Sequence, residues 1–268
     1  MKSKTIVITG STRGIGRGLA DAFLARGCQV MLNGRSPASV VQTCEQLAEK
    51  HGPDSQQRID GQAGDVTSLT DMEDLWAATA ARFGRVDIWI NNAGIGHPFL
   101  PVWEIDPEKV KQVVTVDLLG VLYGTRVAVS GMLTQPEGGH LYNMEGFGSD
   151  GRVQAGISVY GSTKRALRFL TRSLTQETKG TAVKVSAISP GIVITDFLTE
   201  QYKDAPDGFI RAKRIFNMFG DKVETVTPWL ADKVLANNKS GQRIEWLTTS
   251  LFLWRLATSP FRRRDLFE

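Results

Sequence analysis

The chain has 268 residues, 41% of them hydrophobic, which allows one large α/β domain with a full core and makes a second domain unnecessary. Its formal charge of +4 comes entirely from residues 203–268, which hold twelve Lys/Arg against eight Asp/Glu. This uneven distribution argues against a nucleic-acid-binding protein, which usually shows a wider basic face, but it leaves an acidic surface or a membrane open as a partner of the C-terminal end.

The residues MKSK lead straight into an apolar strand, without the long apolar segment of a secretion signal or the pattern of a transit peptide. The chain as given is therefore expected in the cytoplasm, or in the plastid stroma if a transit peptide was removed, with peripheral membrane contact left open. No stretch reaches the ~20 apolar residues of a membrane-spanning helix, since SLFLWRLA at 250–257 is short and contains Arg255. Cys28 and Cys44 are assigned to packing rather than to a disulfide.

Apolar runs of strand length alternate with helical patterns along most of the chain. The patterns predict strands at 5–10, 28–34, 58–66, 86–94, 139–144 and 183–189, and helices at 14–27, 37–50, 68–83, 107–134 and 157–179. This order predicts a Rossmann-type doubly wound parallel sheet in a three-layer α/β/α fold.

After Pro190 the pattern loosens into short helical segments, with a last strand at 242–247. We expect a dinucleotide-binding reductase domain over residues 1–247, with a substrate lid at about 195–240 because ligands bind beyond the carboxyl ends of the strands. A C-terminal aromatic and basic extension then covers 248–268.

The segment ITGSTRGIG (8–16) joins the first strand to the first helix and contains a GxxxGxG pattern. Glycine lets the backbone approach a pyrophosphate, whose charge the free N–H groups and the dipole of the helix start attract. A plain strand-to-helix turn is the alternative, but the position at the first βα junction favours a dinucleotide. The predicted binding residues are Gly10, Ser11, Thr12, Arg13, Gly14, Ile15 and Gly16.

The stretch LNGRS after the second strand selects the cofactor. An NAD site normally places Asp or Glu here to bind the ribose 2′-hydroxyl, and this stretch has no acid. Arg35, together with Arg13, can instead form charge-assisted hydrogen bonds to a 2′-phosphate. NADP(H) is therefore the predicted cofactor, the alternative being two solvated surface arginines.

Tyr160 and Lys164 stand four residues apart in the predicted helix at 157–179, so they face the same side. A tyrosine ordinarily has a pKa of about 10, and an adjacent ammonium favours the phenolate. We expect Lys164 to lower the pKa of Tyr160 toward the working pH, as general acid catalysis needs. Such a pair is common by chance, so it is weak evidence on its own.

Five motifs resemble, in order and spacing, those of the short-chain dehydrogenase/reductases: TGSTRGIG (9–16), GDV (64–66), NNAG (91–94), YGSTK (160–164) and SPGIVITD (189–196). Within that family, IWINNAG, QPEGGHLYNMEGFGSDGR and YGSTKRAL are most similar to the chlorophyll b reductases of plants and algae and their bacterial relatives. The resemblance implies an NADP-dependent oxidoreductase that reduces a carbonyl to an alcohol. It also implies a homodimer or homotetramer, with the long helices as contact surfaces.

The resemblance assigns roles to individual residues. Tyr160 would be the catalytic acid/base, and Lys164 its partner and a ligand of the nicotinamide ribose. Contacts beside the adenine and along the cofactor cleft would come from Asp65, Val66, Asn92, Ala93 and Gly94. Contacts to the nicotinamide amide would come from Pro190, Gly191, Val193 and Thr195.

The catalytic serine of the family pattern would stand at the end of the fifth strand, where this chain has Glu145, Gly146 and Phe147. Ser149 follows in a glycine-rich stretch that can bend the backbone, and we predict that Ser149 binds the substrate carbonyl. The alternative is that Ser149 caps the loop while a backbone N–H or a water polarises the carbonyl. Glu145 is left open between an extra proton donor and an ion-pair partner.

Asp117 stands where the family pattern has Asn, at a helix kink that links the lysine to a chain of water molecules. Asp accepts the same hydrogen bonds but cannot donate an amide N–H, and its charge near Lys164 would stabilise the ammonium. We therefore predict an altered proton relay with Asp117 in it, and no metal site.

The resemblance suggests as substrate the 7-formyl group of chlorophyll(ide) b or a related pigment, reduced to 7-hydroxymethyl. Two alternatives are kept: a short-chain reductase of a smaller ketone or acyl substrate, and a catalytically silent NADP-binding sensor. The extension 248–268 ends in aromatic residues and Arg262, Arg263 and Arg264. It predicts either a helix packed on the fold or on a second subunit, or an amphipathic segment on an anionic membrane near a tetrapyrrole.

Overall fold

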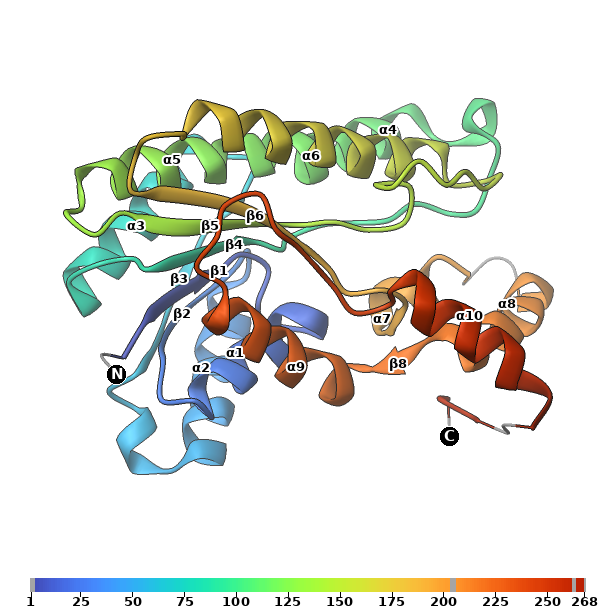
Figure 1. The fold of residues 1–268 in the computed structure, drawn as a ribbon, viewed down its shortest axis with the longest axis horizontal. Helices are drawn as coiled ribbons and strands as arrows, with labels where there is room; N and C mark the ends of the chain where they lie inside the picture. Colours follow the sequence, from blue (N-terminus) through green and yellow to red (C-terminus); the bar gives the residue numbers. More distant parts are fainter. Residues whose placement is uncertain (1–2, 203–205, 262–263, 268) are drawn as a thin grey trace.

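The computed structural model describes residues 3–202, 206–261 and 264–267. Within them a seven-stranded parallel sheet lies between two layers of helices (Figure 1), which confirms the predicted Rossmann-type fold. The strands, in their spatial order, are β3 (Ile59–Ala63), β2 (Gln29–Gly34), β1 (Thr5–Ile8), β4 (Ile88–Asn91), β5 (Gly139–Met144), β6 (Val183–Ser189) and β9 (Arg243–Glu245). The chain changes direction across the sheet between β1 and β4, and such a switch point is where doubly wound sheets bind ligands.

Helices cover both faces of the sheet, and each face has its own hydrophobic core (Figure 1). The lower layer in the figure contains α1 (Gly14–Leu24), α2 (Pro37–His51) and α9 (Val223–Ala236). The upper layer contains α3 (Leu69–Phe83), α4 (Pro107–Val114), α5 (Gly120–Thr134) and α6 (Ser158–Glu177). Short 3-10 turns lie at Pro53–Ser55, Val102–Glu104 and Ser259–Phe261.

Local sequence signals fix several helix ends. The Ser36 side chain accepts a hydrogen bond from the Ser39 N–H at the start of α2, and Pro37 occupies the first turn. Ser68 caps α3 in the same way, and α3 ends at Gly84 in the left-handed conformation. These caps set where each helix meets the sheet.

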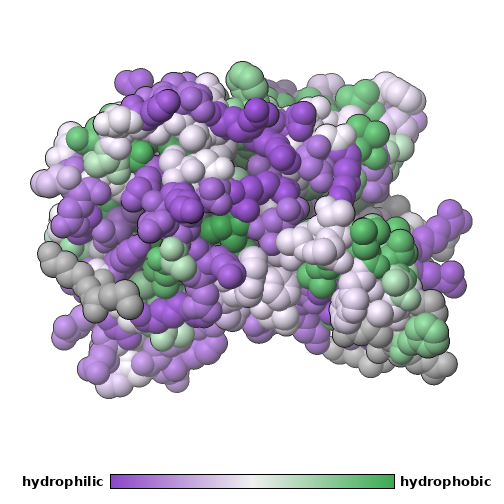
Figure 2. Space-filling view, viewed as in Figure 1, coloured by the Kyte–Doolittle hydropathy of each residue, from purple (hydrophilic) through white to green (hydrophobic). Residues whose placement is uncertain are grey.

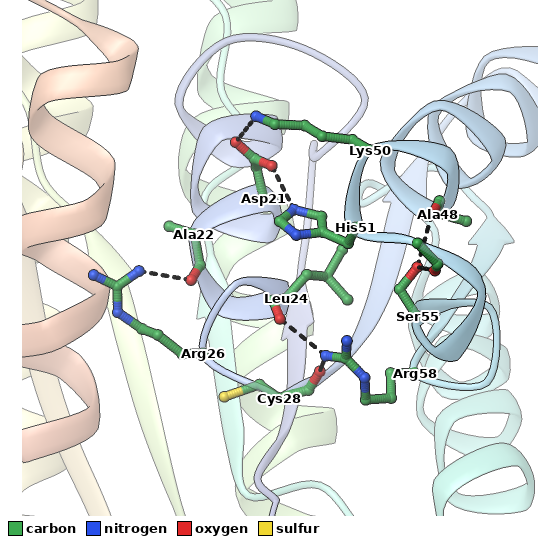
Figure 3. A network of polar contacts seen from close by, with 11 residues as sticks. Asp21, Ala22, Leu24, Arg26, Cys28, Ala48, Lys50, His51, Ser55 and Arg58 are labelled. Atoms are coloured by element: carbon green, nitrogen blue, oxygen red, sulfur yellow. Dashed lines mark hydrogen bonds and ion pairs between the residues drawn. The ribbon is translucent and has the colours of Figure 1, made fainter.

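A polar network ties α1 to α2 on the lower layer (Figure 3). Asp21 lies 2.6 Å from Lys50 Nζ and 2.7 Å from His51 Nε2. Burial alone would raise the pKa of Asp21, but the hydrogen bonds from Lys50 and His51 outweigh it and hold that pKa below its ordinary value. Arg58 donates to the Leu24 carbonyl at 2.9 Å and so fixes the C-terminal end of α1. Helices α1 and α2 are thereby held together by side chains as well as by packing.

One π-helical turn, Thr115–Leu119, joins α4 to α5 in the continuous helix Pro107–Thr134. An 18-residue window of this helix has a mean hydropathy of 1.5, and the helix is long and apolar enough to cross a membrane, so the prediction that no such stretch exists is wrong. The helix meets the criteria for a membrane span by length and composition only. It packs against α3 and α6, and 44% of its apolar window is buried. A core helix passes the same test, so the finding is weak evidence for a membrane span.

Helices α7 (Asp196–Glu200), α8 (Pro206–Phe219) and α10 (Thr249–Thr258) gather at one end of the molecule and are called here the C-terminal lobe (Figure 1). The short strands β7 (Val193–Ile194) and β8 (Asp221–Lys222) pair at its base. Helix α10 packs on α8, and Phe252 stacks on Phe219 with ring centres 4.3 Å apart. Arg262 and Arg263 of the predicted extension lie outside the described residues.

Both cysteines are free. Burial raises the pKa of Cys28, and burial with the nearby Asp60 and Glu45 carboxylates raises that of Cys44 to about 11. Both thiols therefore stay protonated and serve packing, as predicted.

Candidate active site

A cleft of about 650 Å³ opens at the carboxyl ends of the strands, between the sheet and the C-terminal lobe. The glycine loop after β1 and the ends of the other central strands line one side of it, and residues of α7, α8 and α10 line the other. Every predicted cofactor-binding residue lines this cleft except Ser11. One continuous space therefore joins the two ends of the predicted site.

Ser11 is the exception because its side chain is turned into the fold. Its hydroxyl donates to the Ile8 carbonyl at 2.8 Å and accepts from the Asn33 N–H at 2.9 Å. Ser11 is fully buried, so it holds the glycine loop against β2 instead of facing the cleft.

The glycine loop and the NNAG segment are locked together. A Cβ on Gly10, which has φ +62°, would lie 2.8 Å from Ala93 Cα, and one on Gly16 would lie 2.4 Å from the Gly10 carbonyl oxygen. The Asn92 amide donates to the carbonyls of Thr9 and Gly10 at 2.9 and 3.0 Å. The glycines let backbone lie close together in this part of the cleft, directly at the start of α1. The residues present thus fit a dinucleotide, whose pyrophosphate needs close backbone approach and free N–H groups.

Arg35 directly follows β2, Arg13 stands in the glycine loop after β1, and no carboxylate follows β2 in the stretch LNGRS. Arg13 and Arg35 are exposed and both line the cleft. Arg13 Nη1 lies 3.1 Å from Glu200 Oε1 of α7, an exposed ion pair that crosses from the glycine loop to the C-terminal lobe. Asn33 is buried, and its amide donates to the carbonyls of Gln62 and Gly64. The cleft surface here is therefore positive.

Tyr160 and Lys164 both line the cleft from α6, and Asp117 of the π-helical turn reaches Lys164 from inside the fold. Lys164 Nζ lies 3.2 Å from Asp117 Oδ2 and 5.4 Å from the centre of the Tyr160 ring. The Ile95 N–H donates to Asp117 Oδ1 at 2.8 Å. The contact with Lys164 has the distance of an ion pair without hydrogen-bond geometry, so Asp117 Oδ2 accepts no hydrogen bond from the described residues.

The pKa of Tyr160 moves in the direction opposite to the prediction. Burial raises the pKa of Tyr160; Lys164 opposes this rise and the Asp117 carboxylate adds to it. Burial alone would lower the pKa of Lys164, but Asp117 and Tyr160 outweigh it and hold that pKa above its ordinary value. Burial likewise raises the pKa of Asp117 against the pull of Lys164. Lys164 does pull the pKa of Tyr160 down, as expected, but burial outweighs it, so the expected net fall toward the working pH is wrong and the phenol stays protonated near neutral pH.

Ser149 lines the cleft but is already hydrogen-bonded within the protein. Its hydroxyl donates to Glu145 Oε2 at 3.1 Å, and the same oxygen accepts from Arg243 Nε at 2.6 Å. A carboxylate can only accept, so the hydroxyl hydrogen of Ser149 is directed at Glu145. The short contact with Arg243 favours Glu145 as an ion-pair partner over Glu145 as a proton donor.

Gly146 gives the physical reason for the missing hydroxyl at the end of β5. A Cβ on Gly146 would lie 2.2 Å from the Tyr160 hydroxyl oxygen, so a serine there would displace the tyrosine. The chain instead turns through Gly148, at φ +92°, and the Ser149 N–H donates to the Gly146 carbonyl at 3.2 Å. The glycine-rich stretch does bend as expected, and the bend brings Ser149 to the cleft.

His97 was not predicted from the sequence. Its Nε2 accepts a hydrogen bond from the Tyr160 backbone N–H at 3.2 Å, and its Nδ1 lies 2.8 Å from the Pro98 carbonyl. The neutral tautomer with hydrogen on Nδ1 satisfies both contacts. His97 thus caps the first turn of α6, whose own N-cap residue, Ile157, makes no side-chain cap. Its closeness to the NNAG motif was the one available signal.

The half of the cleft beyond Tyr160 is aromatic. Tyr202 stacks on Phe99 with ring centres 4.6 Å apart and meets Phe216 edge-on at 5.9 Å. The Phe197 ring lies 5.8 Å from that of Tyr160. These rings come from α7, α8 and the loops beside them, where the sequence showed no motif. Their arrangement suits an apolar, partly flat ligand.

Comparisons with known proteins agree with this geometry. A family model described as short chain dehydrogenase matches residues 4–206. The probable chlorophyll(ide) b reductase NYC1, chloroplastic, of Oryza sativa subsp. japonica is 37% identical over 99% of this chain and 54% of its own length. The chlorophyll(ide) b reductase NOL, chloroplastic, of Arabidopsis thaliana is 37% identical over 88% of this chain and 66% of its own.

The chain thus spans about half the length of the first of these relatives and under two thirds of the second. Among solved structures, the closed form of serine dehydrogenase complexed with NADP+ matches with a TM-score of 0.78 and 25% identity. That match covers 92% of this chain and 95% of the other.

Proposed function

The chain belongs to the short-chain dehydrogenase family and is an NAD(P)-dependent oxidoreductase, and from this premise we propose that it reduces a carbonyl group with NADPH. The observation that carries the proposal is the single cleft that joins the glycine loop, the two arginines and the Tyr160 hydroxyl. Bound along the glycine loop, the reduced dinucleotide supplies a hydride for the carbonyl carbon. The remaining requirement is a proton for the carbonyl oxygen.

The preference for NADPH rests on the end of β2. Arg35 follows Gly34 where a carboxylate would bind the ribose 2′-hydroxyl of NAD. Guanidinium groups match the geometry of a phosphate and bind it through two parallel hydrogen bonds. Arg13 is the second donor, and a 2′-phosphate would compete with Glu200 for it.

Tyr160 is proposed as the proton donor. Its raised pKa keeps the hydroxyl protonated, which is the form that a general acid needs for reduction. Lys164, held by Asp117, places a positive charge beside the phenolate that forms when the proton leaves. The family pattern pairs an Asn amide with the lysine, and in this chain Asp117 stands in the place of that Asn. This is the altered proton relay that we predicted from the sequence.

Ser149 is proposed to bind the substrate oxygen. To donate a hydrogen bond to a substrate carbonyl, the Ser149 hydroxyl must turn away from Glu145. A product alcohol, in contrast, can donate to the Ser149 oxygen without any change in the Ser149–Glu145 hydrogen bond. Loss of this hydroxyl should therefore weaken the reaction less than loss of Tyr160.

The proposed substrate is the 7-formyl group of chlorophyll(ide) b, which takes up one hydride and one proton to become 7-hydroxymethyl. Two features support it: the names of the relatives that match nearly the whole chain, and the aromatic half of the cleft. A smaller ketone is the second candidate, because D-beta-hydroxybutyrate dehydrogenase of Cupriavidus necator is 31% identical over 75% of this chain. A silent NADP-binding sensor would need Asp117 and the displaced Ser149 to prevent turnover.

The test is NADPH oxidation by the wild type, Tyr160→Phe and Ser149→Ala with chlorophyll b or chlorophyllide b, with the product identified by mass. We expect the hydroxymethyl pigment from the wild type, almost none from Tyr160→Phe and a reduced amount from Ser149→Ala. If the protein binds NADPH but turns over only small ketones, a small ketone replaces the pigment as the proposed substrate. NADPH binding without turnover of any carbonyl would support the sensor.

Three further features belong to the proposal. Residues 1–247 form the reductase domain, with the lid at about 195–240 provided mainly by α7 and α8, and 248–268 form the extension. A homodimer or homotetramer would cover the exposed Leu133 of α5 and Phe169 of α6. The chloroplastic names of the relatives favour the plastid stroma among the predicted compartments.

A further inference from the structure

A smaller cavity of about 290 Å³ lies between α8 and the segment that follows α10. It shares no lining residue with the active-site cleft. Its described lining residues are Arg214, Asn217, Met218, Arg255, Ser259 and Arg264. Three of these six are arginines.

The arginines outnumber the carboxylate that neutralises them. Asp221, which is buried, lies 2.7 Å from Arg255 Nη2 through Oδ2 and 2.8 Å from Arg264 Nη2 through Oδ1. Arg214 is exposed and makes no hydrogen bond or ion pair with any described residue. The neighbouring Asp265 carboxylate accepts from the Phe267 N–H and does not line the cavity. Two positive charges therefore remain uncompensated around this cavity.

Arg255 also has an unused donor. It is only 7% exposed, and its Nε has no acceptor among the described residues, although its Nη1 donates to the Phe219 carbonyl. A buried N–H without an acceptor is costly, so the Arg255 guanidinium is not fully satisfied by the described residues. Asn217 accepts from the Leu266 N–H through Oδ1, so its amide N–H₂ is left as a further donor. The cavity presents donors and no free carboxylate, which selects an anion over a cation.

We propose that this cavity binds a phosphate group. Guanidinium donors in a fixed fork match phosphate oxygens better than they match a halide ion. The surface beside the cavity is apolar: Leu253 and Leu256 of α10 are 57% and 48% exposed, and Phe261 is 89% exposed. Figure 2 shows this as green residues over α10, next to hydrophilic ones. A phosphate held beside an apolar surface fits the headgroup of a phospholipid as well as a free phosphate.

The site is independent of the carbonyl chemistry, but α8 belongs to both. Ile215 and Phe216 line the active-site cleft, whereas Arg214 and Met218 line the anion cavity. An anion bound to Arg214 would therefore restrain one wall of the cleft without touching the cofactor.

The first experiment titrates the full-length protein with inorganic phosphate by calorimetry, in the presence of saturating NADP+. We expect Arg214→Gln to weaken phosphate binding about ten-fold or more, because a charge-assisted hydrogen bond is lost. The matched control is Arg211→Gln, which removes the same charge from an exposed residue of α8 outside the cavity. Arg35→Gln tests whether phosphate binds at the cofactor cleft instead.

The second experiment measures cosedimentation with vesicles of phosphatidylglycerol and of phosphatidylcholine. Binding to phosphatidylglycerol that is lost in Arg214→Gln and kept in Arg211→Gln identifies a lipid headgroup as the source. Phosphate binding without vesicle binding, with the same variant pattern, identifies a free phosphate. Equal losses in Arg214→Gln and Arg211→Gln, sensitivity to Arg35→Gln alone, or no binding in either experiment would overturn the proposal.

Discussion

The two ends of the active-site cleft are built in different ways. The cofactor end is backbone held by short polar contacts, such as those from Asn92 to Thr9 and Gly10. The substrate end is a set of aromatic rings, such as Phe99 and Tyr202, carried by loops and by the helices of the C-terminal lobe. Added side-chain atoms on Gly10 or Gly16 would clash with backbone at the cofactor end, whereas the aromatic side chains at the substrate end can be exchanged. The comparison teaches that cofactor use and substrate choice are separable in this fold, and each can be tested alone.

Tyr160→Phe should give the largest effect, at the point where the two ends meet. Removing the proton donor should lower kcat by about 10²–10⁴-fold, since the hydroxyl acts only in the chemical step. For the same reason, the dissociation constant for NADPH, measured by fluorescence titration, should stay within two-fold of the wild-type value. A two-fold change corresponds to about 0.4 kcal/mol of binding free energy. A variant that keeps more than about a tenth of the wild-type kcat would remove Tyr160 from the role of acid.

Arg35→Gln should affect the cofactor end alone. Loss of a charge-assisted hydrogen bond to the 2′-phosphate should weaken NADPH binding about ten-fold or more and leave NADH binding unchanged. Arg17→Gln is the matched control, because Arg17 is exposed on α1 and bonds Gln46 outside the cleft. Equal losses of affinity for NADPH and for NADH would show that Arg35 does not bind the 2′-phosphate.

Phe197→Ala should affect the substrate end alone. Its ring lines the cleft near Tyr160, and removing it should cost about 1.5 kcal/mol of apolar contact, or roughly ten-fold in KM for the pigment. The KM for a small aldehyde should change less, and NADPH affinity should not change. If the KM for the pigment and the KM for the small aldehyde rise by the same factor, the aromatic half of the cleft is not a pigment-binding surface.

Asp117→Asn should give the smallest change, a displacement of the pH profile. The Asp117 carboxylate helps to raise the pKa of Tyr160, so removing its charge should lower that pKa. Reduction needs protonated Tyr160 and is lost as pH rises through this pKa. The alkaline limb of kcat against pH should therefore move to lower pH in the variant. An unmoved or upward-moved limb would contradict the electrostatic coupling between Asp117 and Tyr160.

The sequence predicted the sheet well and named residues that line one cleft, because both depend on local spacing. Each strand of the central sheet lies within or overlaps its predicted range, and the glycine loop follows β1 as expected. The Ser11 side chain is turned away from the cleft, which could not be predicted because a motif does not reveal which way a side chain turns. The interior bonds to Ile8 and Asn33 decide that orientation.

The catalytic region was predicted only in part because it depends on burial and on contacts distant in sequence. The direction of the Tyr160 pKa shift follows from burial and from Asp117, which lies in a different helix. The displaced Ser149 follows from the space that Gly146 leaves for the tyrosine. His97 and the aromatic rings follow no motif. None of these features has a periodic or spaced pattern in the sequence.

The most direct test of the central claim is hydride transfer itself. Chlorophyllide b is incubated with the wild-type protein and NADPH carrying deuterium at both hydrogens of the nicotinamide C4, and the product is analysed by mass spectrometry and NMR. The account predicts one deuterium on the carbon of the new 7-hydroxymethyl group, and none when Tyr160→Phe replaces the wild type. A hydroxymethyl product without deuterium, or deuterium retained in the nucleotide while NADPH stays bound, would contradict it.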